Sequence, residues 1–179
     1  MRKEDVSSNF TDHLSLQKYE ASKSIDGVRL IGCELHSDDG GDLRELARLK
    51  GGFITGLDDF ELRQINCSRF NPGLIKAFHL HMNQDEIWSV HPMDRLLVGL
   101  LDTRKSSKTE GLQMRFVLGG GKCNALYIPR GVAHGGMVLG QEPVDVVYLV
   151  NENFSVSNPD EWRLPWNILG DDFWSIRKM

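Results

Sequence analysis

The sequence predicts an all-β fold, built as a sandwich or a closed barrel. Short runs with strand character follow one another between Val28 and Val150, and each is bounded by glycine, asparagine, aspartate or proline. These runs are VRLIGCEL, FELRQINCS, GLIKAFHLH, EIWSV, RLLVGLLDT, LQMRFVL, NALYIP and VDVVYLV. Many short strands at close, turn-marked spacing are typical of sandwiches and barrels. Helical character is confined to residues 43–50 (LRELARLK) and to the tail around residues 160–166.

The chain length suits one domain with short arms. It has 179 residues, of which 40% are hydrophobic and 26% charged, and these are ordinary globular values. Residues 1–25 are polar and weakly patterned, so we expect an N-terminal arm there. Residues 26–179 are expected to form a single barrel domain. Its tryptophan-rich C-terminal segment is predicted to pack back over the barrel.

Composition excludes several classes of partner. The net charge is −4 and no face rich in lysine and arginine is evident, which argues against nucleic-acid binding. No apolar run approaches the roughly 20 residues that a membrane helix needs, so we expect no membrane partner. Cys33, Cys67 and Cys123 show no CxxC spacing, which favours reduced thiols and a cytoplasmic protein.

Two histidine motifs stand out among the strands. In the run GLIKAFHLH, His79 and His81 share one face because side chains alternate along a strand. Asp85 and Glu86 follow shortly afterwards, and His134 ends the turn IPRGVAH. Histidines two apart on a strand face are a common metal-ligand arrangement, because both imidazoles reach the same point. We therefore expect His79 and His134 to line one interior pocket.

These motifs resemble the two cupin motifs. The patterns are G-x5-H-x-H-x4-E and P-x-G-x-x-H, and the matching residues are Gly73, His79, His81, Glu86, Pro129, Gly131 and His134. The resemblance implies a cupin-type double-stranded β-helix, or jelly-roll barrel, with short helical terminal segments. In metal-binding cupins the three histidines and the glutamate hold one divalent ion.

A second resemblance covers residues 38 to about 166. The stretch QINCSRFNPGLIKAFH is similar to the Q-x-N-x-S…G-V-x-R-G-x-H pattern of the dTDP-4-dehydrorhamnose 3,5-epimerase family. The segments DDGGDLREL, LDTRKSSKT and IPRGVAHG also resemble family segments. The resemblance implies a nucleotide-sugar substrate, no cofactor, and a homodimer that exchanges its N-terminal strands. The residues expected to contact substrate are Gln64, Asn66, Ser68, Glu45, His134 and His81.

The chemistry of this family removes a proton beside a ketone. A base with a pKa near neutrality takes the proton, a cation or hydrogen bond holds the enolate oxygen, and an acid returns a proton to the other face. The resemblance implies His79 as the base, Lys76 as the oxyanion partner and Tyr148 as the acid. The family segment whose aspartate orients the base is absent here, and Asp171 or Asp172 could replace it.

Our sequence-based hypothesis is therefore an epimerase or isomerase that acts on a nucleotide-linked 4-keto-6-deoxysugar by proton abstraction. Two alternatives stay open. One is a metal-dependent cupin enzyme that uses His79, His81, Glu86 and His134 around a divalent metal ion. The other is a non-catalytic sugar-binding cupin.

Overall fold

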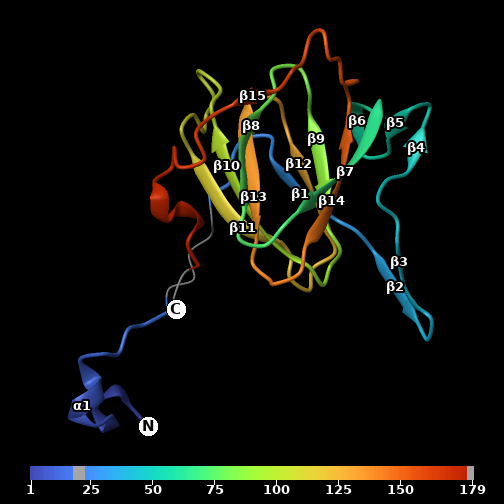
Figure 1. Cartoon of the computed structure of the whole chain (residues 1–179). Coiled ribbons are helices and arrows are strands. Elements are labelled where there is room, and N and C mark those ends of the chain that lie inside the picture. Colours follow the sequence, from blue (N-terminus) through green and yellow to red (C-terminus); the bar gives the residue numbers. More distant parts are fainter. Residues whose placement is uncertain (18–22, 177–179) are drawn as a thin grey trace.

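Two antiparallel sheets face each other and form the barrel of the computed structural model, which describes residues 1–17 and 23–176 (Figure 1). In spatial order, the first sheet contains β1 (Arg29–Gly32), β12 (Asn124–Ile128), β9 (Glu86–Ser89), β14 (Val144–Val150) and β7 (Gln64–Phe70). The second contains β11 (Gln113–Gly119), β10 (Arg95–Asp102), β13 (Val132–Val138), β8 (Ile75–Leu80) and β15 (Trp162–Arg163). The prediction of an all-β jelly-roll barrel is confirmed.

The inside of the barrel follows from alternation along the strands. In β7 the odd positions Ile65, Cys67 and Arg69 are exposed, while the positions between them are partly buried. Successive side chains of a strand point to opposite faces. One face of β7 therefore lines the interior, and it carries polar side chains.

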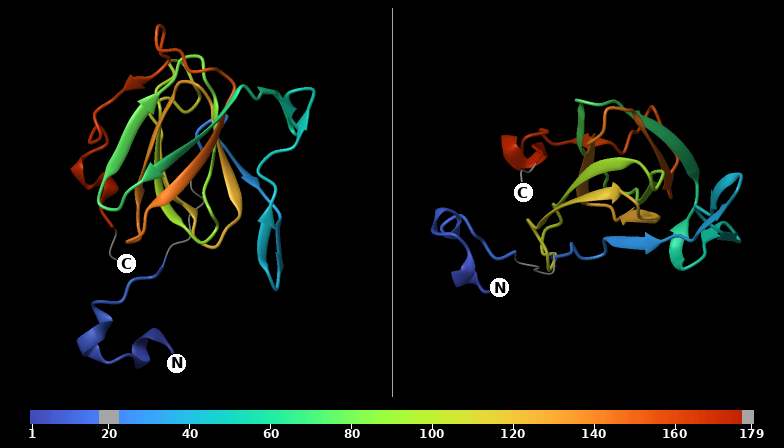
Figure 2. Two further views of the ribbon diagram at one scale, coloured as in Figure 1. Left: turned by 45° about the vertical axis from the view of Figure 1, so that its right-hand side comes forward. Right: turned by 90° about the horizontal axis from the view of Figure 1, so that it is seen from below.

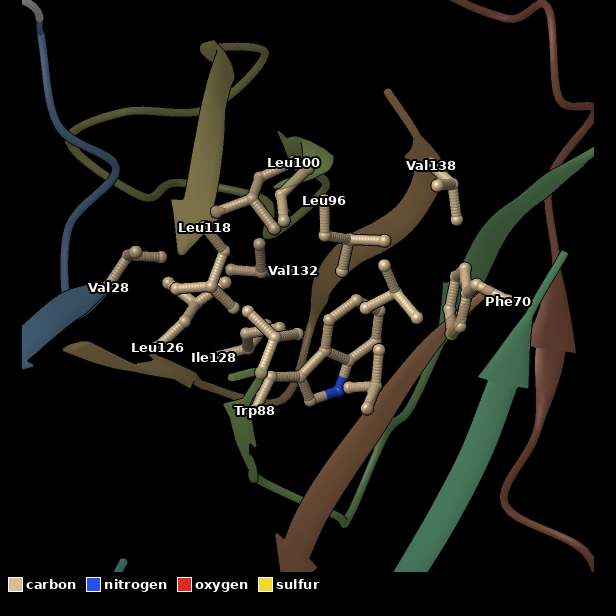
Figure 3. Packing of buried hydrophobic residues seen from close by; sticks show 14 of the residues in the cluster. Val28, Phe70, Trp88, Leu96, Leu100, Leu118, Leu126, Ile128, Val132 and Val138 are labelled. Atoms are coloured by element: carbon tan, nitrogen blue, oxygen red, sulfur yellow. The ribbon is translucent and has the colours of Figure 1, made fainter. Parts of the chain in front are cut away.

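The main hydrophobic core lies between the two sheets (Figure 3). Leu96 and Leu126 are fully buried there, and each such side chain stabilises the fold by about 1.5–3 kcal/mol. Phe70 and Trp88 pack edge to face, with 6.0 Å between their ring centroids. These two aromatic residues also line the cavity described below, so the core forms the floor of the candidate site.

Several segments lie outside the barrel (Figure 2). The hairpin of β2 (Leu35–Asp38) and β3 (Gly41–Arg44) projects away from it, and the small sheet of β4 (Leu49–Lys50), β5 (Phe53–Ile54) and β6 (Leu57–Glu61) follows. A short 3-10 helix (Lys3–Asp5) and α1 (Ser8–Thr11) form the N-terminal end. The helical expectation for residues 43–50 is wrong, because β3 and β4 pair with their neighbours there.

The C-terminal segment returns to the second sheet. The expectation of helix around residues 160–166 is also wrong, since β15 pairs with β8. A 3-10 helix follows at Asp171–Trp174, and its Trp174 is buried against Phe78 with 5.5 Å between ring centroids. At the other end of the chain, Ile25 is buried in the main core. The division of the chain into an arm of residues 1–25 and a barrel domain of residues 26–179 remains a prediction. Among the described residues, no helix is long and apolar enough to cross a membrane.

Candidate active site

A cavity of about 730 Å³ opens between the two sheets. His79 of β8 and His134 of β13 line it from the second sheet, and Tyr148 of β14 lines it from the first. The cavity wall also includes Lys76, Gln64, Asn66, Ser68, His81 and Glu86. Most of the side chains singled out from the sequence are thus gathered in one place.

A local irregularity in β8 brings Lys76 and His79 to the same cavity. On a flat strand, residues three apart point to opposite faces. Here His79 pairs with His134 and Lys76 pairs with Gly136, so two steps on β13 span three on β8. A side chain at Gly135 could not be accommodated, because its Cβ would lie 2.3 Å from the Cβ of Ala77. The extra residue in β8 is a β-bulge, which re-aims one side chain.

His79 lies between a carboxylate, a guanidinium and a second imidazole. Its Nδ1 is 3.3 Å from Oε1 of Glu161, and its Nε2 is 3.2 Å from Nη1 of Arg163. The His134 ring stacks on it at 6.1 Å between centroids. Burial lowers the pKa of His79 to about 4, with smaller contributions from the charges of His134 and Arg163. His79 is therefore neutral at pH 7 and able to accept a proton.

Glu86 is buried between two histidines at the back of the cavity. Its Oε1 is 3.1 Å from Nε2 of His81, and its Oε2 is 3.3 Å from Nε2 of His134. Burial alone would raise the pKa of Glu86, but the charge and hydrogen bond of His134 and those of His81 hold it below its ordinary value. Burial likewise opposes the charged form of His81, yet its bond to Glu86 raises the pKa of His81.

The other nitrogen of each of these two histidines is held by a backbone carbonyl. Nδ1 of His81 contacts the carbonyl oxygen of Asp160, and Nδ1 of His134 lies 3.0 Å from that of Val132. The turn before His134 needs Gly131, whose φ is +76° and whose N–H donates to the carbonyl of His81 over 2.8 Å. That glycine turn therefore ties the two motifs together.

The polar face of β7 supplies the opposite wall. Nζ of Lys76 donates to Oγ of Ser68 over 2.6 Å and lies 4.6 Å from the centre of the Phe70 ring. Nε2 of Gln64 donates to Oδ1 of Asn66 over 2.7 Å. These side chains present both donors and acceptors to the cavity.

Tyr148 is half-buried on the wall that the first sheet provides. Burial raises the pKa of its phenol, and the negative charges of Glu86 and Glu161 raise it further. Tyr148 therefore keeps its proton at neutral pH and is able to act as an acid.

Some expected residues lie elsewhere. Glu45 does not line the cavity; it is ion-paired with Arg48 at 2.8 Å beside a second hollow on the outer face of the first sheet. The reason is that the β2–β3 hairpin carries the chain away from the barrel mouth. Asp171 accepts a hydrogen bond from Asn167, and the carboxylate beside His79 is that of Glu161.

Sequence reasoning did not single out Asp160, Glu161 and Arg163, although all three hold the histidines. The Asp160 carboxylate accepts hydrogen bonds from the backbone N–H groups of residues 82, 83 and 84. This anchors the segment across the cavity mouth. The only signal was the charged run D-E-W-R, and its pairing with a strand some 80 positions earlier leaves no local pattern.

Comparisons with known proteins agree on one family. Residues 22–168 match the family model described as dTDP-4-dehydrorhamnose 3,5-epimerase. The chain is 39% identical over 143 residues to the spore coat polysaccharide biosynthesis protein SpsL of Bacillus subtilis (strain 168), covering 80% of this chain and 91% of that one. It is 27% identical over 146 residues to the probable low-salt glycan biosynthesis epimerase Agl13 of Haloferax volcanii, covering 80% and 90%.

The fold has close counterparts among solved structures. A dTDP-4-dehydrorhamnose 3,5-epimerase from Bacillus anthracis, solved with TDP and PPi bound, superposes with a TM-score of 0.70. It is 22% identical, and the match covers 88% of this chain and 90% of that chain. That likeness shows the jelly-roll fold, and the family match over residues 22–168 adds the sequence evidence. The chain therefore belongs to the dTDP-4-dehydrorhamnose 3,5-epimerase family.

Proposed function

We propose that this protein is a sugar-nucleotide epimerase that inverts a carbon beside the ketone of a nucleotide-linked 4-keto-6-deoxysugar. One observation carries the proposal: a neutral histidine from one sheet and a protonated tyrosine from the other line the same cavity. Family membership and the polysaccharide and glycan roles of SpsL and Agl13 support the same class of substrate.

The proposed reaction uses three side chains in turn. Nε2 of His79 takes the proton from the carbon beside the ketone, and the bonding pair moves to the carbonyl oxygen to give an enolate. Glu161, next to Nδ1, stabilises the imidazolium that forms. Tyr148 then delivers a proton to the opposite face, which inverts the carbon, and Lys76 is the expected partner of the oxygen.

Substrate binding is assigned to the polar wall of the cavity. Gln64, Asn66 and Ser68 offer amide and hydroxyl groups that suit sugar hydroxyls, and His81 and His134 close the back. A pocket with few convergent polar groups and titratable residues of perturbed pKa is the usual form of a catalytic site. We expect the protein to act in the cytoplasm, as its three free cysteines favour.

The proposed assembly is a homodimer that exchanges the β2–β3 hairpin. The hairpin projects from the barrel with Leu43 69% exposed and Leu35 40% exposed, which a partner surface would cover. In that arrangement Glu45 reaches the cavity of the second subunit rather than its own. Sedimentation with and without residues 35–44 tests this, and a monomeric full-length protein would contradict it.

A second candidate follows from the group of His81, Glu86 and His134, whose ligand atoms all lie within 4.8 Å of one another. Both histidines have Nδ1 directed to a backbone carbonyl, which is the usual support for a metal ligand. These residues fit a divalent ion, which would polarise a carbonyl oxygen. His79 is not in this group, so the four-ligand set is not assembled. Elemental analysis of protein purified with and without Glu86→Gln tests the candidate.

The proposed function is tested by product analysis. Purified protein is incubated with dTDP-4-keto-6-deoxyglucose, and the configuration at C3 and C5 is read from proton couplings by NMR. Inversion at either carbon supports the proposal and gives the regiochemistry. An unchanged sugar that nonetheless binds to folded protein would contradict it and favour a non-catalytic sugar-binding cupin.

A further inference from the structure

Arg163 lies beside the proposed base, and no sequence motif predicted it. It lies on β15, directly paired with His79 of β8, and its Nη1 is 3.2 Å from Nε2 of His79. A guanidinium only donates hydrogen bonds, so this Nε2 must accept and carries no proton. The ring proton is then on Nδ1, facing Glu161. The lone pair that would take the substrate proton is the one that Arg163 contacts.

Substrate must displace this contact. A carbon that gives its proton to Nε2 has to approach to about 3–3.5 Å. The ketone oxygen is only two bonds from that carbon, so it enters the space next to Nε2 where Nη1 now lies. Arg163 then loses its hydrogen bond to Nε2 of His79 and has the ketone oxygen of the substrate as a new acceptor.

On the basis of the proposed function, we propose that Arg163 donates to the ketone oxygen and stabilises the enolate as His79 removes the proton. The C–H bond breaks, an N–H bond forms at Nε2, and the electron pair moves to the oxygen. The products of this step are an imidazolium beside Glu161 and an enolate beside Arg163. Each new charge thus faces a group of opposite sign. After Tyr148 has returned a proton to carbon, His79 releases its proton to solvent and Tyr148 takes one up, and this exchange restores the starting contacts.

Arg163 is not itself among the residues that line the cavity and reaches it through its contact with His79. The two described cations that do line the cavity, Arg130 and Lys76, are held in different ways. The Arg130 side chain donates to both oxygens of the Asp85 carboxylate, at 3.0 Å each, and that carboxylate is buried. Lys76, which is already expected to contact the oxygen, donates to Oγ of Ser68, and Arg163 is proposed as a second donor beside it. The Arg163 side chain is 59% exposed, and among the described residues it keeps its ion pair with Glu161 when it leaves the neutral His79. Arg163 can therefore shift to the oxygen while its ion pair with Glu161 persists.

The test compares Arg163→Met, Arg163→Lys and a matched control. The control is Arg63→Met. Arg63 pairs with Glu61, which is also two residues away, at 2.7 Å and with 50% exposure, whereas only Arg163 of the two contacts His79 in the described structure. Deuterium uptake from D2O into dTDP-4-keto-6-deoxyglucose gives kcat and KM. We expect kcat to fall about 100-fold in Arg163→Met with little change in KM, because loss of one oxyanion donor costs 10²–10³-fold. Arg163→Lys should recover part of the loss, and Arg63→Met should match wild type.

Two results would overturn the inference. One is a wild-type kcat in Arg163→Met, or a loss confined to KM. The other is an unchanged ¹⁵N resonance of His79 Nε2 in folded Arg163→Met, which would show that the guanidinium does not hold the lone pair. Failure of wild-type protein to exchange any deuterium is a separate outcome: it would remove the proposed function, and the inference with it.

Discussion

Glu86→Gln provides the sharpest test of the buried histidine cluster. Each oxygen of the Glu86 carboxylate accepts from two donors. Oε1 accepts from Nε2 of Gln84 over 2.7 Å and from Nε2 of His81. Oε2 accepts from Nε1 of Trp88 and from Nε2 of His134. A glutamine keeps one acceptor oxygen and turns an NH2 group toward the other two donors. Each buried donor left without an acceptor costs about 1–3 kcal/mol, and breaking a buried ion pair costs about 3–5 kcal/mol. We expect the free energy of unfolding to fall by about 3–5 kcal/mol.

The pH dependence of this loss has a definite sign. The folded pKa of Glu86 lies below its ordinary 4.5, so its contribution is present above pH 4.5 and is lost as pH falls further. The folded pKa of His81 lies above its ordinary 6.5, so its contribution is complete below pH 6.5 and is lost as pH rises through the raised value. The difference in stability between wild type and Glu86→Gln is therefore largest between pH 4.5 and 6.5.

Urea unfolding of both proteins at pH 6 and pH 9 measures this difference. Glu142→Gln is the matched control, because Glu142 is exposed and a surface substitution of this kind stays within about 0.5 kcal/mol. A difference below about 1 kcal/mol at pH 6, or one that grows toward pH 9, would refute the view that the Glu86 carboxylate is ion-paired with His81 in the folded protein.

Three further predictions concern the base, the acid and the C-terminal segment. Because the pKa of His79 is lowered to about 4, kcat/KM should stay level from pH 7 down to about pH 5 and fall only near pH 4; a fall centred at 6.5 would contradict this. Tyr148→Phe should still wash deuterium into substrate yet yield little inverted product, and full inversion by NMR would exclude Tyr148 as the acid. Trp174→Ala should cost about 3–5 kcal/mol in urea unfolding, whereas the exposed Trp162→Ala should cost far less; equal losses would contradict the packing.

The barrel could be predicted because its strands and turns are marked by patterns of neighbouring residues in the sequence. The alternation of buried and exposed side chains around Asn66 and the turn at Gly131 can both be recognised from neighbouring residues. They place the polar wall and His134 in the cavity, where the structure has them. The shared cavity of Lys76 and His79 needed a bulge, which depends on the close approach of two strands. The two-residue periodicity of a regular strand would instead place Lys76 and His79 on opposite faces.

The partners of the base could not be predicted because they come from long-range pairing. Glu161 and Arg163 reach His79 only through the pairing of β15 with β8, and the sequence around them suggested helix instead. Asp171 was expected to orient the base because it lies near the C-terminus, but the carboxylate beside His79 belongs to Glu161, ten residues earlier. Glu45 illustrates the same limit, since a projecting hairpin decides where it lies.

Deuterium exchange in a variant that lacks His79 shows whether this histidine removes the proton. Wild type, His79→Gln and the exposed control His13→Gln are incubated in D2O with dTDP-4-keto-6-deoxyglucose, and C3 and C5 are followed by NMR. We expect uptake at one or both carbons in wild type and His13→Gln, and none above background in His79→Gln. Uptake at the wild-type rate in folded His79→Gln would show that another group removes the proton and that His79 is not the base.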